Sequence, residues 1–328
     1  MSGQYVNLFT DFGFKKIFGE DSSGEEGSKA HLISFLNTLL PQKHQIQDLT
    51  FIQNEYQGAT LLDRKAIFDL NCVSSSGEHF IVELQKAKQN FFKDRSLFYA
   101  TFPIQQQAKK GDDWNFKLSA VYTIGILDFV FDEDKQDPKE SKQVVHQVQL
   151  KNQQNQVFYD KLTFIYLTLP NFTKTEDELE TLQDKWFFLF RHLHRLQEQP
   201  QKLQERIFNS LFKQANIAQF KPEERTAYES SLKYYRDLTN VVDTARGEGR
   251  EEGREEGYQK AQAEAELKIQ AAENRLQEMV LNMLQAGLPD SQVMAIAQIT
   301  ADELAAIKAE KSSTLLQGRS NPGAEGLC

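Results

Sequence analysis

The chain has 328 residues, of which 26% are charged, and it carries a formal net charge of -9. This length is enough to bury the core of one large or two modest domains, which excludes a single small module. The negative balance excludes attraction of nucleic acid by the mean charge of the molecule, so any basic surface must be local.

The N-terminal residues show no basic stretch followed by an apolar one, and no apolar run in the sequence reaches membrane-spanning length. The two cysteines, Cys72 and Cys328, lie far apart in sequence, which argues against a disulfide framework or a zinc site. We therefore expect a cytoplasmic protein without a membrane partner.

The first third of the chain predicts one helix and three strands. Apolar residues recur at helical spacing over residues 29–40, before Pro41. Three strand-like runs follow, at residues 49–55, 65–73 and 79–85. The last two are joined by residues 74–77 (SSSG), whose turn chemistry favours a hairpin.

A second helix and a buried strand come next. The helix is predicted over residues 91–110, and Gly111 stands where a left-handed C-cap is expected. Residues 118–127 form a continuous apolar run, which is typical of a strand covered on both faces. The order helix, three strands, helix, strand predicts an α/β fold with a mixed sheet and helices packed on it.

The middle of the chain is expected to complete this domain. The charged residues 132–142 predict an exposed loop, and residues 144–150 and 161–169 predict two further strands. From residue 177 to residue 238 the pattern is helical, with a broad apolar face that suits packing on the sheet. We therefore expect one domain over residues 1–245.

The composition changes at residues 247–257, where glycine, glutamate and arginine recur with a four-residue period. This repeat predicts a charged helix or a tether, marginal by itself because each glycine in a helix costs about 1 kcal/mol relative to alanine. Beyond the boundary we expect the repeat and a coiled-coil-like helix at residues 246–287, a short helical hairpin at 288–311, and a disordered tail at 312–328.

The helix after the repeat carries an apolar seam. Its members alternate steps of three and four, as in a coiled coil: Ile269, Ala272, Leu276, Met279, Met283 and Ala286. The seam predicts either a homodimer through the C-terminal helix or a fold back onto the same chain. Gly287 and Pro289 end this helix, and Thr300 with Glu303 predicts a capping box for the last one.

Two carboxylates interrupt apolar strands. Asp69 lies within residues 66–70 (AIFDL) and Glu83 within residues 80–84 (FIVEL), where a buried strand prefers a hydrophobe. On neighbouring strands of one hairpin they can share a hard divalent cation, which offsets their desolvation and repulsion. A metal there would polarise a phosphodiester and lower the pKa of bound water. The alternative is that both carboxylates lie at strand edges in water.

The chain resembles the recombination-promoting nuclease and transposase family of the PD-(D/E)XK superfamily. The resemblance rests on residues 10–19 (TDFGFKKIFG), 32–40 (LISFLNTLL), 63–72 (DRKAIFDLNC), 80–85 (FIVELQ), 92–95 (FKDR) and 107–111 (QAKKG). It extends through residues 168–172 and 185–186 into the repeat and so covers most of the chain. The motifs are short, but their order and spacing are specific.

The resemblance implies a restriction-endonuclease-like mixed sheet flanked by helices, followed by an α-helical C-terminal extension. It implies that Asp69 and Glu83 bind Mg²⁺ or Mn²⁺, and that Gln85 stands where the superfamily's lysine orients or activates the attacking water. Gln85 departs from the general pattern, because an amide can position water but cannot supply positive charge. Asp11 and Glu55 match further family positions and could complete the metal shell. An N-cap or a surface role for either residue is the alternative.

A locally basic segment follows Gln85. Its six cations outnumber the single acid Asp94 and are candidate contacts to a phosphate backbone: Lys86, Lys88, Lys93, Arg95, Lys109 and Lys110. The aromatic residues between them are expected to face the core, and Arg95 can equally form a structural ion pair.

The leading hypothesis is a metal-dependent DNA endonuclease that hydrolyses phosphodiester bonds in recombination or in a mobile element, with Asp69, Glu83 and Gln85 as its catalytic residues. The alternative is a non-catalytic DNA-binding or assembly protein on a degenerate nuclease scaffold, with the C-terminal helix as its working part. A third possibility is the same site acting on RNA.

Overall fold

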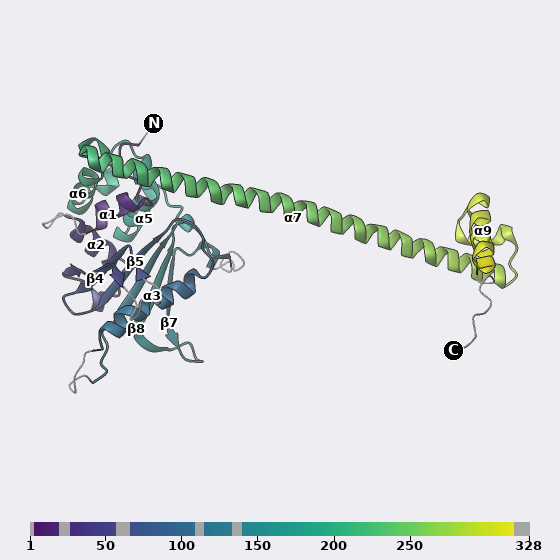
Figure 1. Cartoon of the computed structure of the whole chain (residues 1–328), viewed down its shortest axis with the longest axis horizontal. Helices are drawn as coiled ribbons and strands as arrows, with labels where there is room; N and C mark the ends of the chain where they lie inside the picture. Colours follow the sequence, from purple (N-terminus) through teal and green to yellow (C-terminus); the bar gives the residue numbers. More distant parts are fainter. Residues whose placement is uncertain (1–2, 20–26, 57–65, 109–114, 133–139, 318–328) are drawn as a thin grey trace, which may run out of the picture. The chain divides into compact units, whose positions relative to one another are not determined.

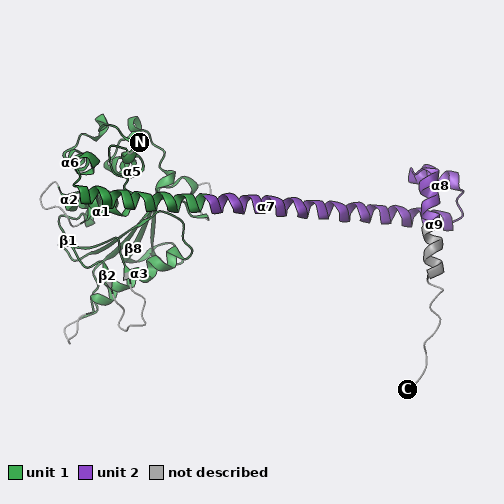
Figure 2. Ribbon diagram, turned by 45° about the horizontal axis from the view of Figure 1, so that its top comes forward, with its two compact units in different colours: residues 1–243 green, residues 244–328 purple. Residues whose placement is uncertain are grey.

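The computed structural model describes residues 3–19, 27–56, 66–108, 115–132 and 140–317. The chain forms two compact units, residues 1–243 and residues 244–328 (Figure 2). The division between them falls between Asp243 and Thr244, just before the glycine-rich repeat.

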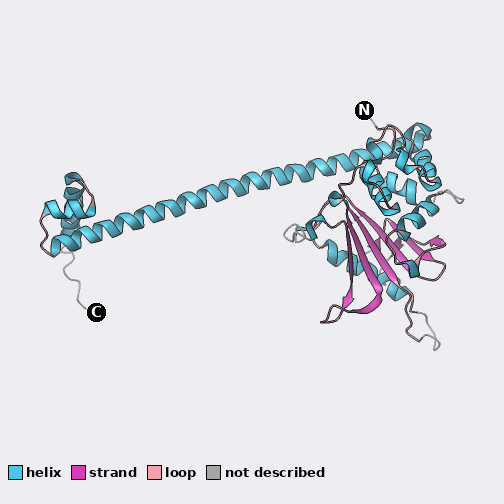
Figure 3. Cartoon of the chain, turned by 180° about the vertical axis from the view of Figure 1, so that it is seen from behind, coloured by secondary structure: helices cyan, strands magenta, loops and turns pink. Residues whose placement is uncertain are grey.

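The first unit is built on a six-stranded mixed sheet (Figure 3). The strands lie in the order β1 (Leu49–Phe51), β4 (Leu70–Ser74), β5 (His79–Gln85), β6 (Val121–Leu127), β8 (Val157–Thr168) and β7 (Val145–Lys151). The pairs β5 with β6 and β6 with β8 are parallel, and the other neighbours are antiparallel. A separate short ladder pairs β2 (Glu55–Tyr56) with β3 (Ala66–Ile67). The predicted mixed sheet is confirmed.

The side chains of β5 show how helices cover both faces of this sheet. Phe80, Val82 and Leu84 join the main core cluster. That cluster includes residues of α1 (Asp11–Phe18), α2 (Ser28–Asn37), α5 (Leu182–His192) and α6 (Arg206–Ala215) (Figure 1). Ile81 points the other way, into a cluster with side chains of α3 (Phe92–Gln106). Because both faces are covered, the central strands β5 and β6 are mostly apolar on both faces, and Glu83 and Gln85 stand out as buried polar side chains.

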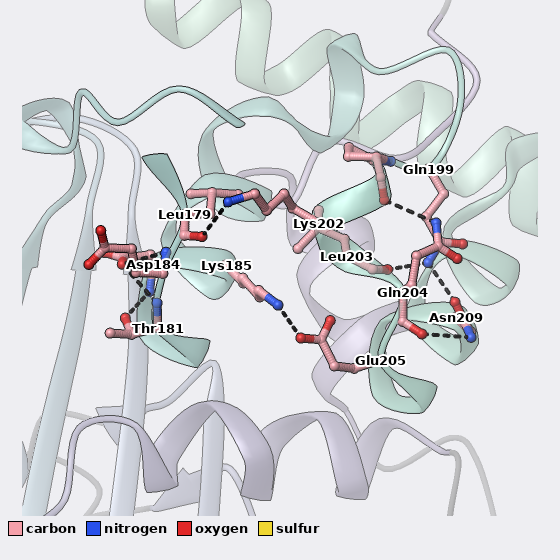
Figure 4. Close-up of polar contacts among 12 residues, drawn as sticks. Leu179, Thr181, Asp184, Lys185, Gln199, Lys202, Leu203, Gln204, Glu205 and Asn209 are labelled. Atoms are coloured by element: carbon pink, nitrogen blue, oxygen red, sulfur yellow. Dashed lines mark hydrogen bonds and ion pairs between the residues drawn. The ribbon is translucent and has the colours of Figure 1, made fainter. Parts of the chain in front are cut away.

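Polar contacts fix the helices that carry the main core (Figure 4). At the start of α5, the Asp184 backbone N–H donates to Thr181 Oγ1 at 3.0 Å, and the Thr181 N–H donates to Asp184 Oδ2 at 3.0 Å. This capping box satisfies backbone groups that the first turn leaves unpaired. Lys185 pairs with Glu205, directly before α6, and the Lys202 ammonium donates to the Leu179 carbonyl at 3.4 Å. The fully buried Trp186 then packs its ring against Phe18, Phe35 and Phe208.

Several predicted boundaries differ from those observed. The predicted strand at residues 65–73 is broken at Phe68 and Asp69, which separate β3 from β4. The first predicted strand, residues 49–55, likewise divides into β1 and the start of β2. β8 begins at Val157 rather than at residue 161, because its first residues pair with the end of β7 in a long hairpin. α3 ends at Gln106, and the predicted cap Gly111 lies outside the described residues.

The second unit is helical. α7 (Pro222–Gln285) begins in the first unit and runs through the glycine-rich repeat, which is therefore helix rather than tether. A Cβ atom added at Gly249, Gly253 or Gly257 would meet nothing within 4 Å, so this part of the helix has no packing partner among the described residues. Within the described ranges, no helix is both long enough and apolar enough to cross a membrane.

The end of α7 folds with α8 (Asp290–Ala297) and α9 (Ala301–Gln317). Val280, Val293, Leu304 and Ile307 are buried there, and Leu276 and Met283 of the predicted seam pack against them. The fold-back alternative therefore holds for part of the seam. Ile269 and Met279, by contrast, are exposed by 59% and 42%.

The ends of these helices follow the local signals. Gly287, at φ +82°, lies just beyond α7, in the left-handed region that favours glycine. Thr300 and Glu303 form the predicted capping box, with the Glu303 N–H donating to Thr300 Oγ1 at 3.3 Å and the Thr300 N–H donating to Glu303 Oε2 at 2.7 Å. α9 continues to Gln317, so the predicted tail from residue 312 is wrong for its first six residues, 312–317, and residues 318–328 lie outside the described part.

Candidate active site

Asp69 lies at the point where the β4–β5 ladder stops. Leu70 is the last residue of β4 that pairs with β5, opposite Val82. One residue earlier, the side chain of Asp69 bonds to β5 in place of the backbone. Its Oδ2 accepts a hydrogen bond from the Leu84 backbone N–H at 2.6 Å, a donor that a continued ladder would have engaged. The strand break therefore places a carboxylate at the end of the hairpin, which the apolar pattern of residues 66–73 did not reveal.

Glu83 lies on β5, on the face of the sheet that α3 covers. Its side chain is 7% exposed. Hydrogen bonding to the Asp69 backbone and to the Gln85 side chain lowers the pKa of its carboxylate. One carboxylate oxygen, Oε1, is buried without a hydrogen-bond partner in the described part of the chain. An unpartnered buried carboxylate oxygen is costly and indicates that the site is built for a ligand.

Burial and the charge of Asp69 oppose the ionisation of Glu83. Burial raises the pKa of Glu83 to about 8, with the nearby charge of Asp69 adding to the rise and that of Arg95 opposing it. Burial also raises the pKa of Asp69, against the hydrogen bond from the Leu84 N–H. A bound cation would relieve both effects at once, because it favours the ionised form of each group. The predicted alternative, two carboxylates in water, does not describe Glu83.

The pair fits a hard divalent cation. Mg²⁺ keeps several waters and is commonly held by one or two carboxylates together with substrate phosphates. Asp69 and Glu83 supply two such carboxylates, and Glu83 Oε1 has no hydrogen-bond partner among the described residues. Among the described residues, no three His, Cys, Asp or Glu side chains are grouped so as to hold a metal ion. Asp11 and Glu55 therefore do not join the pair in one cluster.

Two residues of α3 lie beside Glu83. The positive charge of Arg95 lowers the pKa of Glu83, and its guanidinium packs 5.3 Å from the ring centroid of Phe92 and 5.9 Å from that of Tyr99. Burial and the charge of Glu83 raise the pKa of Tyr99. Tyr99 was expected only as a core aromatic. Its spacing of four residues from Arg95, one helical turn, is the signal that could have identified it.

A cavity of about 430 Å³ opens on the other side of Asp69. Asp11, Lys15 and Lys16 of α1 line it, together with residues of β1 and of the first turns of α7. Thr10 caps α1 by accepting from the Gly13 N–H at 3.0 Å, so Asp11 is the first helical residue and not the N-cap. Asp11 pairs with Lys15 at 3.1 Å, and both are about half exposed.

The first turns of α7 close this region. The Phe12 backbone N–H donates to Ser231 Oγ at 3.1 Å, which ties α7 to α1. Tyr235 donates to Asp128 Oδ2 at 2.8 Å, and the Asp128 N–H donates to the Gln85 carbonyl at 2.9 Å. α7 is thus connected to the strand end that carries Gln85. The sequence predicted helical packing here but not these contacts.

The four predicted basic residues that the structure describes have different surroundings: Lys86, Lys88, Lys93 and Arg95. Lys88 pairs with Asp132, and the Lys93 ammonium lies 4.4 Å from the ring centroid of Phe131. Lys109 and Lys110 lie outside the described residues. Lys86 lies just beyond the end of β5, and its ammonium is 5.4 Å from the ring centroid of Tyr234 in α7. The expected role of these cations in phosphate contacts stays a prediction.

The comparisons with known proteins gave one match. The sequence profile of a family described as "PD-(D/E)XK nuclease family transposase" matches residues 8–245, well over half of the chain. The matched region contains the whole sheet and the Asp69, Glu83 and Gln85 positions. The comparison with curated proteins and the comparison with solved structures each found no match.

Proposed function

We propose, because the chain belongs to the PD-(D/E)XK nuclease family of transposases, that it is a metal-dependent endonuclease that hydrolyses DNA phosphodiester bonds in recombination or in a mobile element. The observation that carries the proposal is the coupled pair of Asp69 and buried Glu83, with one partnerless oxygen on Glu83. A scaffold that had lost the reaction would have no reason to keep a buried carboxylate beside a second, half-buried one that repels it.

Asp69 and Glu83 would hold Mg²⁺ or Mn²⁺, which supplies charge stabilisation of the reacting phosphate and lowers the pKa of bound water. Asp69 is positioned for this by the Leu84 N–H, and Glu83 by the Asp69 N–H. Arg95 balances the negative charge of the pair from α3. Asp11 and Glu55 are proposed as outer contributors, through water, because they do not cluster with the pair.

Gln85 is proposed to orient the attacking water. Its side-chain amide donates to Glu83, which leaves its carbonyl oxygen to accept a hydrogen bond from a water molecule. Gln85 is 8% exposed, so this contact would form in a largely closed site. The amide carries no charge and cannot replace the ammonium of a lysine.

The proposal is tested by incubating the purified full-length protein with supercoiled plasmid, linear duplex, single-stranded DNA and RNA of matched sequence. We expect cleavage of DNA in Mg²⁺ or Mn²⁺ and none in EDTA. Cleavage of RNA alone would reassign the substrate. Intact nucleic acid in every arm, with DNA binding retained, would instead support the non-catalytic alternative.

A homodimer through α7 is part of the proposal. Ile269 and Met279 of the predicted seam are exposed by 59% and 42% although both are apolar. Two copies could bury these side chains against each other, as coiled-coil seams do.

We expect light scattering of the full chain to give the mass of a dimer, and Ile269→Glu to shift it toward the monomer. Asn274→Glu, a change at an exposed position on the opposite face of the same helix, is the matched control and should leave the mass unchanged. A monomeric wild-type chain at micromolar concentration would contradict this part of the proposal.

A further inference from the structure

Two aromatic residues of the segment after β5 are exposed, although we expected the aromatic side chains there to face the core. Phe91, directly before α3, is exposed by 79%, and Phe98 on α3 is exposed by 44%. A single exposed apolar side chain needs no explanation. These two, however, lie on either side of Arg95, the residue of α3 whose charge acts on Glu83.

The backbone of Phe91 is strained. Its φ of 61° and ψ of 25° lie in the left-handed region, where a bulky side chain has a steric cost that glycine does not have. Packing of the ring does not offset this cost, because the ring is mostly in water. Strained residues of this kind are concentrated at sites that bind a ligand. The conformation of Phe91 therefore indicates that its exposed ring has a function.

A cavity of about 300 Å³ opens beside Phe91. Lys88 and Lys93 line it, together with Asp94 and with Phe129, which lies just beyond β6. The cavity thus lies where the parallel strands β5 and β6 end, and ligands of open α/β sheets bind outside the carboxyl ends of such strands. A partly aromatic cavity with two cations matches a flat, uncharged ring that is attached to a negatively charged backbone.

Packed side chains connect Phe91 to Asp69. The Arg95 backbone N–H donates to the Phe91 carbonyl at 2.9 Å, and the Arg95 guanidinium lies 5.9 Å from the ring centroid of Tyr99. The ring of Tyr99 packs edge-on against that of Phe68, with 5.0 Å between their centroids. Phe68 directly precedes Asp69. A strand bound at the start of α3 is therefore close to the candidate carboxylate pair.

We infer that Phe91 and Phe98 stack on unpaired bases of the strand to be cut, so that the site takes DNA with single-stranded character rather than intact duplex. This inference rests on the proposed function. Single strands are bound by aromatic rings that stack on bases and by cations along the phosphates, and the segment supplies both. In an intact duplex, each base is covered by its neighbours, and its faces are not open to a protein ring.

Arg95 extends the stacking surface. Its guanidinium donates to the neutral side chain of Gln89 and packs on the rings of Phe92 and Tyr99. A planar guanidinium stacks on bases as aromatic rings do, and it also attracts phosphate. A protein partner could cover the two exposed rings as well, but the cations beside them favour nucleic acid.

The test measures binding without cleavage, with the full-length protein in EDTA. Fluorescence anisotropy gives the Kd for labelled oligo(dT) and for the duplex that the same strand forms with oligo(dA). We expect wild type to bind the single strand roughly tenfold more tightly, and Phe91→Ala to weaken single-strand binding by roughly 5- to 50-fold. Phe98→Ala should weaken it less, because its ring is more covered. Phe158→Ala, which removes an exposed ring on β8, is the matched control and should bind like wild type.

Two further variants separate stacking from simple apolar contact. Phe91→Leu keeps an apolar side chain but has no ring, so it should lose affinity for oligo(dT) as Phe91→Ala does. Phe91→Trp keeps a ring and should bind at least as tightly as wild type. Its added indole should be quenched when oligo(dT) binds, beyond any change in the fluorescence of wild type. Melting curves check that each variant is folded.

Unchanged affinity of Phe91→Ala and Phe98→Ala for oligo(dT) would overturn the inference. If those variants instead lost self-association in light scattering, the surface would be an interface between copies of the chain. Wild-type affinity in Phe91→Leu would also overturn it, because stacking would then not be needed. The proposed function is tested separately, by cleavage in Mg²⁺ or Mn²⁺. A chain that binds oligo(dT) through Phe91 but cuts no DNA would contradict the proposed function and leave the stacking surface standing.

Discussion

Asp69→Asn and Glu83→Gln are each expected to lower the rate of metal-dependent DNA cleavage by roughly 10²- to 10³-fold or more, without unfolding the protein. Both substitutions keep the shape of the side chain and remove the charge that would hold the metal. In Asp69→Asn the amide oxygen can still accept from the Leu84 N–H, so the end of the hairpin should be preserved. Initial rates at saturating Mg²⁺ measure the loss.

Asp160→Asn is the matched control for this experiment. Asp160 is an exposed carboxylate on β8 of the same sheet and has no place in the proposed site. It should cleave like wild type. If Asp69→Asn and Glu83→Gln cleaved as fast as wild type, Asp69 and Glu83 would not be the catalytic residues. The central part of the proposed function would then be wrong.

Without metal, Glu83→Gln is expected to stabilise the protein, and the gain should grow with pH. The pKa of Glu83 is raised from 4.5 to about 8 in the folded state, so the folded protein binds this proton more tightly than the unfolded chain. Below pH 4.5 Glu83 is protonated in both the folded and the unfolded protein, and its full contribution to the free energy of unfolding is present. Above pH 4.5 the unfolded chain begins to release this proton, so the contribution decreases and is lost as pH rises through 8.

Glutamine has no proton to release, so the variant avoids this loss. The difference in free energy of unfolding between wild type and Glu83→Gln should reach the order of a few kcal/mol at pH 9 and be small at pH 5. Denaturant unfolding in EDTA from pH 5 to pH 9 measures it. Adding Mg²⁺ should stabilise wild type at high pH and leave the variant almost unchanged, because the metal binds the ionised pair. A pH-independent difference would show that Glu83 is not a buried ionising group.

Local patterns were sufficient for much of the fold. The apolar runs at residues 79–85 and 118–127 predicted β5 and the buried strand β6, and the capping signals at Thr300 and Glu303 predicted the start of α9. Boundaries were less accurate where tertiary contacts decide them. The predicted strand at residues 65–73 breaks because the Asp69 carboxylate, and not a backbone carbonyl, pairs with the Leu84 N–H.

The sequence by itself determined the order of most strands and helices, although not α1, and it identified Asp69 and Glu83 as charges in apolar strands. Periodicity and composition are properties of neighbours along the chain, which is why they can be read there. Only the tertiary structure brought Arg95 and Tyr99 from α3 to Glu83, and Lys86 to Tyr234 of α7. Those contacts join residues on different elements, and their distances depend on how helices pack on each face of the sheet. For the same reason, the basic segment that reads as continuous in sequence divides between separate surroundings once folded.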